Sequence, residues 1–182
     1  MTNQEPEELR FACFSGGCFW CIVPAFADLD GVLSVTAGYS GGQTEAPTYG
    51  QVKSQETGHR ESVRIEYDPQ KVTYGDLLDC FLAQVDPFDG EGQFIDRGFS
   101  YTLAVYPSSP EEAEEANRKI RALEERAGRP VLIAVEPFQT FWPAEEEHQD
   151  FYLKNPEKFE EEMISSGRRT PPPEGNADSR KL

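Results

Sequence analysis

Two cysteines, Cys18 and Cys21, stand at the start of a predicted helix, within the sequence GGCFWC at residues 16–21. The apolar run 11–15 predicts a short buried strand, the two glycines end it, and apolar residues then recur at helical spacing. Cys18 is therefore expected in the first helical turn, where free backbone N–H groups and the macrodipole favour an anion. At such positions the pKa of a thiol falls from about 8.5 to roughly 3.5–7.5, and the thiolate is the nucleophile. The pattern indicates a reactive thiol.

Two other interpretations of this cysteine pair stay open. Buried cysteines often only fill a core. A CxxC pair can also be half of a zinc site, but a closed site needs two more ligands at close spacing. The remaining candidates, Cys13, Cys80, His59 and His148, are unpaired in the sequence. We therefore expect no metal or other cofactor, and we expect Cys13 and Cys80, on apolar elements, to lie in the core.

A predicted strand, residues 61–67, carries a carboxylate at the edge of an apolar layer. Glu61 shares one face with Val63 and Ile65, which mark that face as the core side. Burial raises the pKa of a carboxyl group, and a glutamate kept protonated near neutral pH can act as a general acid. If the strand frays at this end, Glu61 instead lies in water and has no such role. The residues leave both outcomes open.

The predicted elements that position these residues do not alternate regularly. Strands are expected at 11–15, 33–37, 61–67, 101–105 and 131–136. Helices are expected to start at Cys18, at Thr73 and at Ser109, where the sequence SPEE predicts a capping box with proline at the first helical position. Because strict βαβ alternation is missing, the pattern favours an α+β fold, a two-layer sandwich with helices packed on a mixed or antiparallel sheet.

Two glycine-containing loops could approach a ligand. GYSGG at 38–42 is followed by a tyrosine at 49, whose phenol can donate hydrogen bonds. The second loop, 86–100, is long, contains Gln93, and loops of this length are often functional. Either loop could instead be a simple connection.

The composition of the whole chain limits the possible functions. Its 182 residues carry 17 basic and 33 acidic side chains, and the net charge of −16 disfavours binding to nucleic acid. No apolar stretch approaches the roughly 20 residues of a membrane span, and residues 2–8 lack the features of a signal peptide. We expect a cytoplasmic monomer with one domain, 10–164, between a flexible N-terminus, 1–9, and a disordered tail, 165–182.

Together these segments resemble the A-type peptide methionine sulfoxide reductases. GCFW at 17–20 matches the reactive motif of that family. Further matching segments follow in family order: GYSGG at 38–42, PTY at 47–49, TGHRE at 57–61, YDP at 67–69, DP at 86–87, the segment 93–101 and EEHQ at 146–149. The resemblance covers residues 11–159 and implies an α+β sandwich around a mixed sheet.

The resemblance also implies a reaction and a role for each matching residue. Cys18 would attack the sulfur of methionine sulfoxide, and Glu61 would protonate the sulfoxide oxygen. Five residues would surround the substrate: Tyr49 and Tyr101 as donors to the oxygen, Phe19 and Trp20 as the wall that receives the S-methyl group, and Asp96 as a contact to substrate or water. The S epimer, free or in a peptide, would be reduced, which repairs proteins after oxidative damage. His59 and His148 would support the site without transferring protons.

The chain departs from the family at the cysteines that recycle the enzyme. Many members carry them in a C-terminal tail, but residues 165–182 contain no cysteine, and Cys21 stands where many members have glycine. Residues i and i+3 at a helix start can approach disulfide distance, about 5.5–6 Å between Cα atoms. We hypothesise that Cys21 forms a disulfide with the Cys18 sulfenic acid and that thioredoxin reduces it. Direct reduction at Cys18, or resolution by Cys80 or Cys13, is the alternative.

Two functions from other classes fit parts of the pattern. A thiol–disulfide oxidoreductase would use the CxxC pair on disulfides and would reduce insulin efficiently. A non-enzymatic module would bind methionine-containing partners through its aromatic residues, and Cys18→Ser would leave that binding unchanged.

Overall fold

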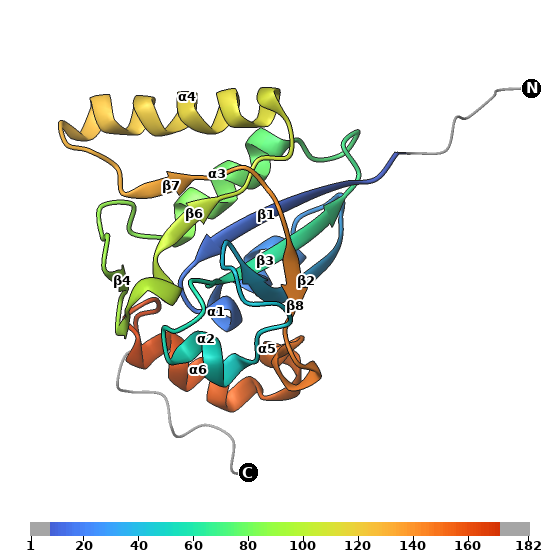
Figure 1. The fold of residues 1–182 in the computed structure, drawn as a ribbon, viewed down its shortest axis with the longest axis vertical. Coiled ribbons are helices and arrows are strands. Elements are labelled where there is room, and N and C mark those ends of the chain that lie inside the picture. The colour runs from blue at the N-terminus through green and yellow to red at the C-terminus, as the bar shows by residue number, and fades with distance from the viewer. Residues whose placement is uncertain (1–7, 172–182) are drawn as a thin grey trace, which may run out of the picture.

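A six-stranded sheet organises the chain in the computed structural model, which describes residues 8–171 (Figure 1). Its strands are β1 (Arg10–Gly16), β2 (Val32–Ser40), β3 (Arg60–Tyr67), β6 (Leu103–Val105), β7 (Ile133–Val135) and β8 (Phe141–Pro143), in the order β7-β6-β1-β3-β2-β8. Neighbouring strands are antiparallel except β6 and β7, which are parallel. A separate ribbon pairs β4 (Gly92–Gln93) with β5 (Asp96–Arg97). The sheet is mixed, as the sequence predicts.

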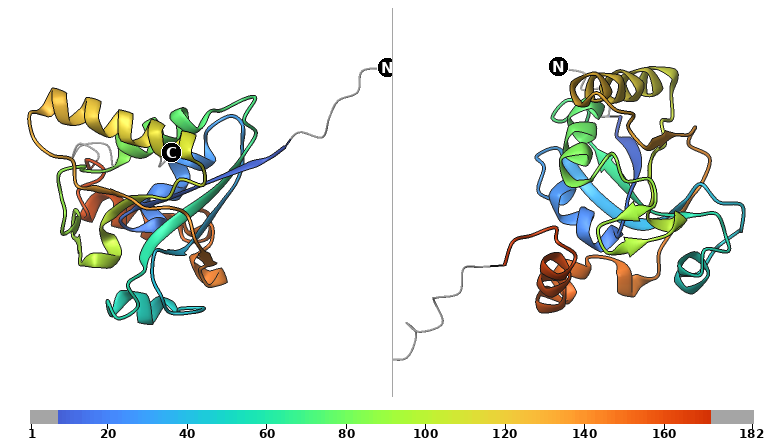
Figure 2. Two further views of the ribbon diagram at one scale, coloured as in Figure 1. Left: turned by 45° about the horizontal axis from the view of Figure 1, so that its top comes forward. Right: turned by 90° about the vertical axis from the view of Figure 1, so that its left-hand side faces the viewer.

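The helices gather mainly on one side of this sheet (Figures 1 and 2). They are α1 (Phe19–Ala27), α2 (Tyr49–Lys53), α3 (Tyr74–Gln84), α4 (Pro110–Ala127), α5 (Phe151–Lys154) and α6 (Pro156–Ser165), with 3₁₀ turns η1 (Phe99–Tyr101) and η2 (Glu146–His148). Helices α1 and α3 pack on the central strands, α4 packs on α3 and β7, and α5 and α6 contact α1. The predicted α+β sandwich is confirmed.

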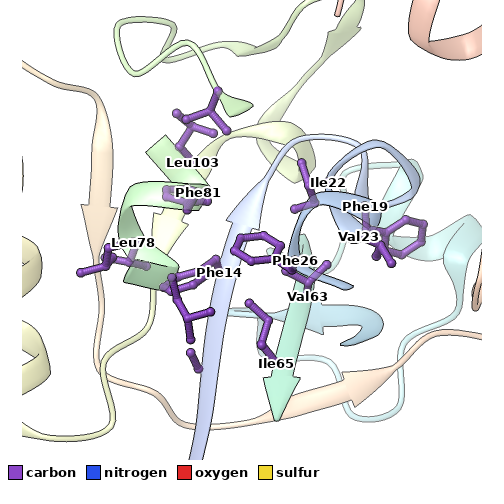
Figure 3. Close-up of a cluster of buried hydrophobic side chains, with 14 of the residues drawn as sticks. Phe14, Phe19, Ile22, Val23, Phe26, Val63, Ile65, Leu78, Phe81 and Leu103 are labelled. Atoms are coloured by element: carbon purple, nitrogen blue, oxygen red, sulfur yellow. The ribbon is translucent and has the colours of Figure 1, made fainter. Parts of the chain in front are cut away.

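An apolar layer holds α1 over the middle of the sheet. Phe14 of β1 and Val63 of β3 are fully buried and face the helices (Figure 3). The ring of Phe14 lies 5.9 Å from that of Phe26 in α1 and 5.2 Å from that of Phe81 in α3, measured between centroids. Burying aromatic rings of this size contributes strongly to stability. The layer therefore fixes α1, and with it the cysteine that precedes the helix.

The opposite face of the sheet is built around buried polar groups. The hydroxyls of Ser15 and Ser62 lie 2.7 Å apart, and the Arg60 guanidinium donates to the Glu136 carboxylate at 3.0 Å. Cys13 lies on this face, where its sulfur is 3.4 Å from the Ser40 hydroxyl. Burial raises the pKa of the Cys13 thiol to about 12. Cys13 is therefore an inert core thiol, as expected.

Several element boundaries differ from those predicted. β2 continues to Ser40 because GYS of the predicted loop pairs with the start of β3. The strand expected at 101–105 begins at Leu103 because the preceding residues form η1. The elements α2, β8, α5, α6, the 3₁₀ turns and the ribbon of β4 and β5 were not predicted. All except α6, which has ten residues, are two to five residues long and lack a clear periodic pattern.

The cap of α4 and the tail also differ in detail. Ser109 accepts from the backbone N–H of Glu112 at 3.2 Å, but the Glu112 carboxylate accepts from Ser108, so only half of the predicted capping box forms. Of the tail predicted to be disordered from residue 165, the first part is ordered: Ser165 ends α6, and Ser166 is buried. The rest of that tail from 172, and residues 1–7 of the predicted flexible N-terminus, lie outside the described residues.

Candidate active site

The reactive segment begins where β1 turns into α1. Gly17 adopts φ 83°, which favours glycine, and a Cβ on it would lie 2.7 Å from the Gln93 side chain. Cys18 is the N-cap of α1, and its carbonyl accepts from the backbone N–H of Cys21 at 3.1 Å. Both thiols are buried and reduced. The turn thus places the two sulfurs on the same first turn of the helix, as the sequence predicts.

Glu61 of β3 reaches the start of α1 from the sheet. Its carboxylate accepts the backbone N–H of Phe19 at 3.0 Å, and the residue is 2% exposed. Burial raises the pKa of this carboxyl group to about 8, and the nearby Asp96 adds to the effect, while the Phe19 hydrogen bond opposes it. The alternative that Glu61 lies in water at a frayed strand end is wrong. At neutral pH this side chain carries a proton that it can donate.

The pKa of Cys18 is raised, so the predicted lowering is wrong. Interaction with the neighbouring Cys21 thiol, burial, and the carboxyl groups of Glu61 and Asp96 when they are ionised all favour the protonated thiol. One of the free N–H groups of the first turn, that of Phe19, is used by Glu61 instead. The pKa of Cys21 moves the other way, first because of the hydrogen bond with Cys18. The two thiols are therefore linked, and ionisation of one disfavours ionisation of the other.

Aromatic rings from three segments form a wall beside Cys18. The ring of Trp20 stacks on that of Phe151 with centroids 4.0 Å apart and an interplanar angle of 7°. The rings of Phe19 and Tyr49 have centroids 6.3 Å apart. His148 lies 4.3 Å from Tyr49 between ring centroids, and its Nδ1 accepts from the Trp20 indole N–H at 3.2 Å. Burial lowers the pKa of His148, so the neutral ring needed for this acceptance is favoured.

The two candidate phenols lie in the same electrostatic environment as the acid and the thiol. Burial, with the charges of Glu61 and Cys18, raises the pKa of both Tyr49 and Tyr101 above the ordinary phenol value. Both hydroxyls therefore stay protonated and can donate hydrogen bonds. Asp96 of β5 is half-buried, and its Oδ2 atom is buried without a hydrogen-bond partner among the described residues. The structure thus brings all eight predicted site residues to the start of α1.

Other supporting residues were missed or only partly recognised. Glu145 accepts from the backbone N–H of Tyr49 at 3.1 Å and from the Tyr39 hydroxyl at 2.9 Å, so it anchors α2 at the site. His148 supports the site as predicted, since it orients Trp20. His59 is buried against Gly42, where a Cβ would lie 2.2 Å from its ring, and it supports the glycine-containing loop. Single polar residues of this kind give no periodic pattern that a sequence could reveal.

Residues 8–171 contain no group of three or more acidic, histidine or cysteine side chains placed to hold a metal ion. In the same part of the chain, no helix combines the length and the apolar character needed to cross a membrane.

Comparison with known proteins places this site in a family. A family model described as peptide methionine sulfoxide reductase matches residues 10–174. The chain belongs to this family. Within it, the peptide methionine sulfoxide reductase of Streptococcus agalactiae serotype Ia is 44% identical over 160 residues, which cover 87% of this chain and 93% of the relative.

Solved structures of the same fold agree with this membership. Methionine sulfoxide reductase A of Corynebacterium diphtheriae has a TM-score of 0.75 at 27% identity, covering 86% of this chain and 79% of that one. Reduced Mxr1 from Saccharomyces cerevisiae has a TM-score of 0.78 at 24% identity, covering 84% and 89%. Mxr1 in complex with Trx2 has a TM-score of 0.56 at 17% identity, covering 81% and 89%. The last two support the fold alone.

Proposed function

We propose that this protein reduces the S epimer of methionine sulfoxide, free or in peptides, and so repairs oxidised proteins. The observation that carries the proposal is the buried, protonated Glu61 beside Cys18, under a wall of aromatic rings. A sulfoxide is a poor electrophile because its oxygen gains negative charge as it leaves. A proton donor and two phenols at that position offset this charge.

The reaction balances with the groups present. Glu61 gives its proton to the sulfoxide oxygen while the Cys18 sulfur attacks the sulfoxide sulfur, and the Cys18 proton replaces the one that Glu61 has lost. Collapse of the adduct breaks the sulfur–oxygen bond of the substrate and the new bond between the two sulfurs, while the hydroxyl passes to the Cys18 sulfur; methionine is released and Cys18 is left as a sulfenic acid. Cys18 is oxidised and methionine sulfur is reduced. Tyr49 and Tyr101 hydrogen-bond the oxygen throughout, and Asp96 holds substrate or water.

The aromatic wall selects the methyl thioether end of the substrate. Phe19 and Trp20 offer apolar surface for the S-methyl group, and each sulfur–aromatic contact contributes about 0.3–1.5 kcal/mol. The stack of Trp20 on Phe151 and its hydrogen bond to His148 hold the indole in place before substrate arrives. Preorganisation of this kind lowers the cost of binding.

Recycling proceeds through Cys21. Its thiol lies on the same first turn of α1 as that of Cys18, whereas Cys13 lies on the opposite face of the sheet and Cys80 accepts a hydrogen bond from Gln84 within its own helix. Cys21 attacks the Cys18 sulfenic acid, a disulfide forms, and hydroxide leaves as water. We assign its reduction to thioredoxin, in line with the solved complex of yeast Mxr1 with Trx2. Thioredoxin use fits a monomer in the reducing cytoplasm that needs no other cofactor.

The test supplies a peptide containing separated S- and R-methionine sulfoxide and counts methionine by mass spectrometry. With excess dithiothreitol, the S epimer is expected to turn over and Cys18→Ser to abolish turnover. With thioredoxin as sole reductant, Cys21→Ser is expected to stop after one turnover, while the matched control Cys80→Ser continues. Turnover of neither epimer would overturn the proposal and favour a binding module; rapid reduction of insulin would favour a thiol–disulfide oxidoreductase.

A further inference from the structure

The segment that follows α6 turns back onto the reactive cysteines. Gly167 adopts φ 82°, its N–H bonds the carbonyl of Ile164 at 3.1 Å, and the N–H of Arg169 bonds that of Met163 at 2.9 Å. This arrangement ends the helix and reverses the chain at the glycine. Ser166 is 4% exposed. The reversal aims the side chain of Arg168 at the protein interior rather than at solvent.

The Arg168 guanidinium is held against the turn that leads into Cys18. Its Nη2 donates to the carbonyl of Gly16 at 3.2 Å, and its Nη1 donates to that of Gln84 at 3.3 Å. The guanidinium carbon lies 4.5 Å from the centroid of the Phe94 ring. Nη2 is also 2.9 Å from where a Cβ on Gly17 would stand. Contacts from three separate segments therefore fix this cation against the turn that precedes Cys18.

Most of the other charged groups around the cysteine pair are acidic, and the cation Lys53 acts on Glu61 and Asp96. The ionisable groups that act on the Cys21 thiol are Cys18, Asp96, Glu162, Glu61 and Arg168. Among them, Arg168 alone is a cation, and it favours the Cys21 thiolate, whereas Asp96 and Glu162 oppose it. The Nε atom of Arg168 is buried and has no hydrogen-bond partner among the described residues, so it retains one free donor.

We propose that Arg168 is the positioning residue of the recycling step, which makes Cys21 the thiolate that attacks the Cys18 sulfenic acid. In this step the Cys21 sulfur bonds the Cys18 sulfur, the sulfur–oxygen bond of the sulfenic acid breaks, and the hydroxide that leaves takes a proton to become water. Cys21 is oxidised and Cys18 is reduced to the disulfide level. This inference rests on the proposed function, and Arg168 supports the recycling step of that function.

The experiment follows one turnover without any reductant. Wild type, Arg168→Met, Arg168→Gln and Arg168→Lys each receive one equivalent of peptide S-methionine sulfoxide, and the reaction is quenched with dimedone and N-ethylmaleimide between pH 5.5 and 9. Mass spectrometry counts methionine, the dimedone-trapped sulfenic acid and the Cys18–Cys21 disulfide. Arg169→Met is the matched control, since Arg169 carries the same charge one residue away but faces Glu160 and Phe159.

Both neutral variants are expected to accumulate sulfenic acid and to form the disulfide about tenfold more slowly near neutral pH, because losing an adjacent cation raises a thiol pKa by about one unit. The pH midpoint of disulfide formation should move upward in Arg168→Met and Arg168→Gln but not in Arg168→Lys or Arg169→Met. A purely structural role would not move that midpoint. The inference is overturned if the midpoint is unchanged in both neutral variants, or if Arg168→Lys shifts it as far as they do. Absence of methionine in wild type would instead refute the proposed function.

Discussion

The proton on Glu61 should make the stability of the folded protein depend on pH. Burial raises the pKa of this carboxyl group from 4.5 to about 8, so the folded chain holds the proton more tightly than the unfolded chain. The resulting stabilisation is complete below about pH 4.5 and is lost as the pH rises through about 8. At 1.36 kcal/mol per pKa unit, the full difference is about 5 kcal/mol, an upper figure for a single buried group.

Glu61→Gln should remove this dependence, because an amide of the same shape cannot ionise and can still accept the Phe19 N–H. The free energy of unfolding is measured at pH 5 and pH 9 by urea denaturation of the reduced protein, monitored by circular dichroism. The wild type should lose up to about 4 kcal/mol more stability than the variant across this range, because at pH 5 the unfolded carboxyl group is already mostly ionised. Equal pH dependence of the two proteins would refute the assignment of a buried, protonated carboxyl group.

The same variant separates stability from chemistry. If Glu61 donates the proton, the single-turnover rate of the wild type should fall as the pH rises through about 8, since the acid form is then lost. Glu61→Gln should be about 10²–10⁴-fold slower and should lose that fall. If Glu61→Gln is more stable than the wild type at pH 9 but nearly inactive, then burying the Glu61 carboxyl group costs stability and the reaction requires it.

Further perturbations test the wall and the scaffold. Trp20→Ala should lower kcat/KM for the sulfoxide peptide about 2- to 12-fold, the equivalent of one sulfur–aromatic contact; an unchanged kcat/KM in steady-state assays would exclude the indole from substrate binding. Gly38→Ala should destabilise the fold by at least about 1–3 kcal/mol, because its Cβ would lie 2.3 Å from the carbonyl oxygen of Trp142 in β8. Its control is Gly50→Ala, where no atom lies within 4 Å of the added Cβ and where urea midpoints should stay equal or rise.

Periodic patterns predicted the main elements because each buries a regular face. The alternation around Val63 and the helical spacing from Phe19 to Phe26 both correspond to the apolar layer that the structure contains. The short elements β8 and α2 are held by partners distant in sequence, such as Glu145, whose carboxylate accepts the N–H of Tyr49. No local pattern carries such a contact. Likewise, Arg168 lay in a segment predicted to be disordered because its partners are backbone carbonyls far along the chain.

The identity of the side chain that accepts the free N–H at the start of α1 explains both what the sequence predicted at the site and what it missed. A free N–H at the start of α1 favours an anion, and Cys18 was the nearest candidate along the chain. In three dimensions Glu61 reaches the same N–H from β3 and takes it. The helix therefore orients the acid, while the Arg168 cation favours the thiolate of Cys21. With this division of roles, a protonated Glu61 is available for the first step, and Arg168 remains to favour the Cys21 thiolate in the second, when Cys18 is a sulfenic acid.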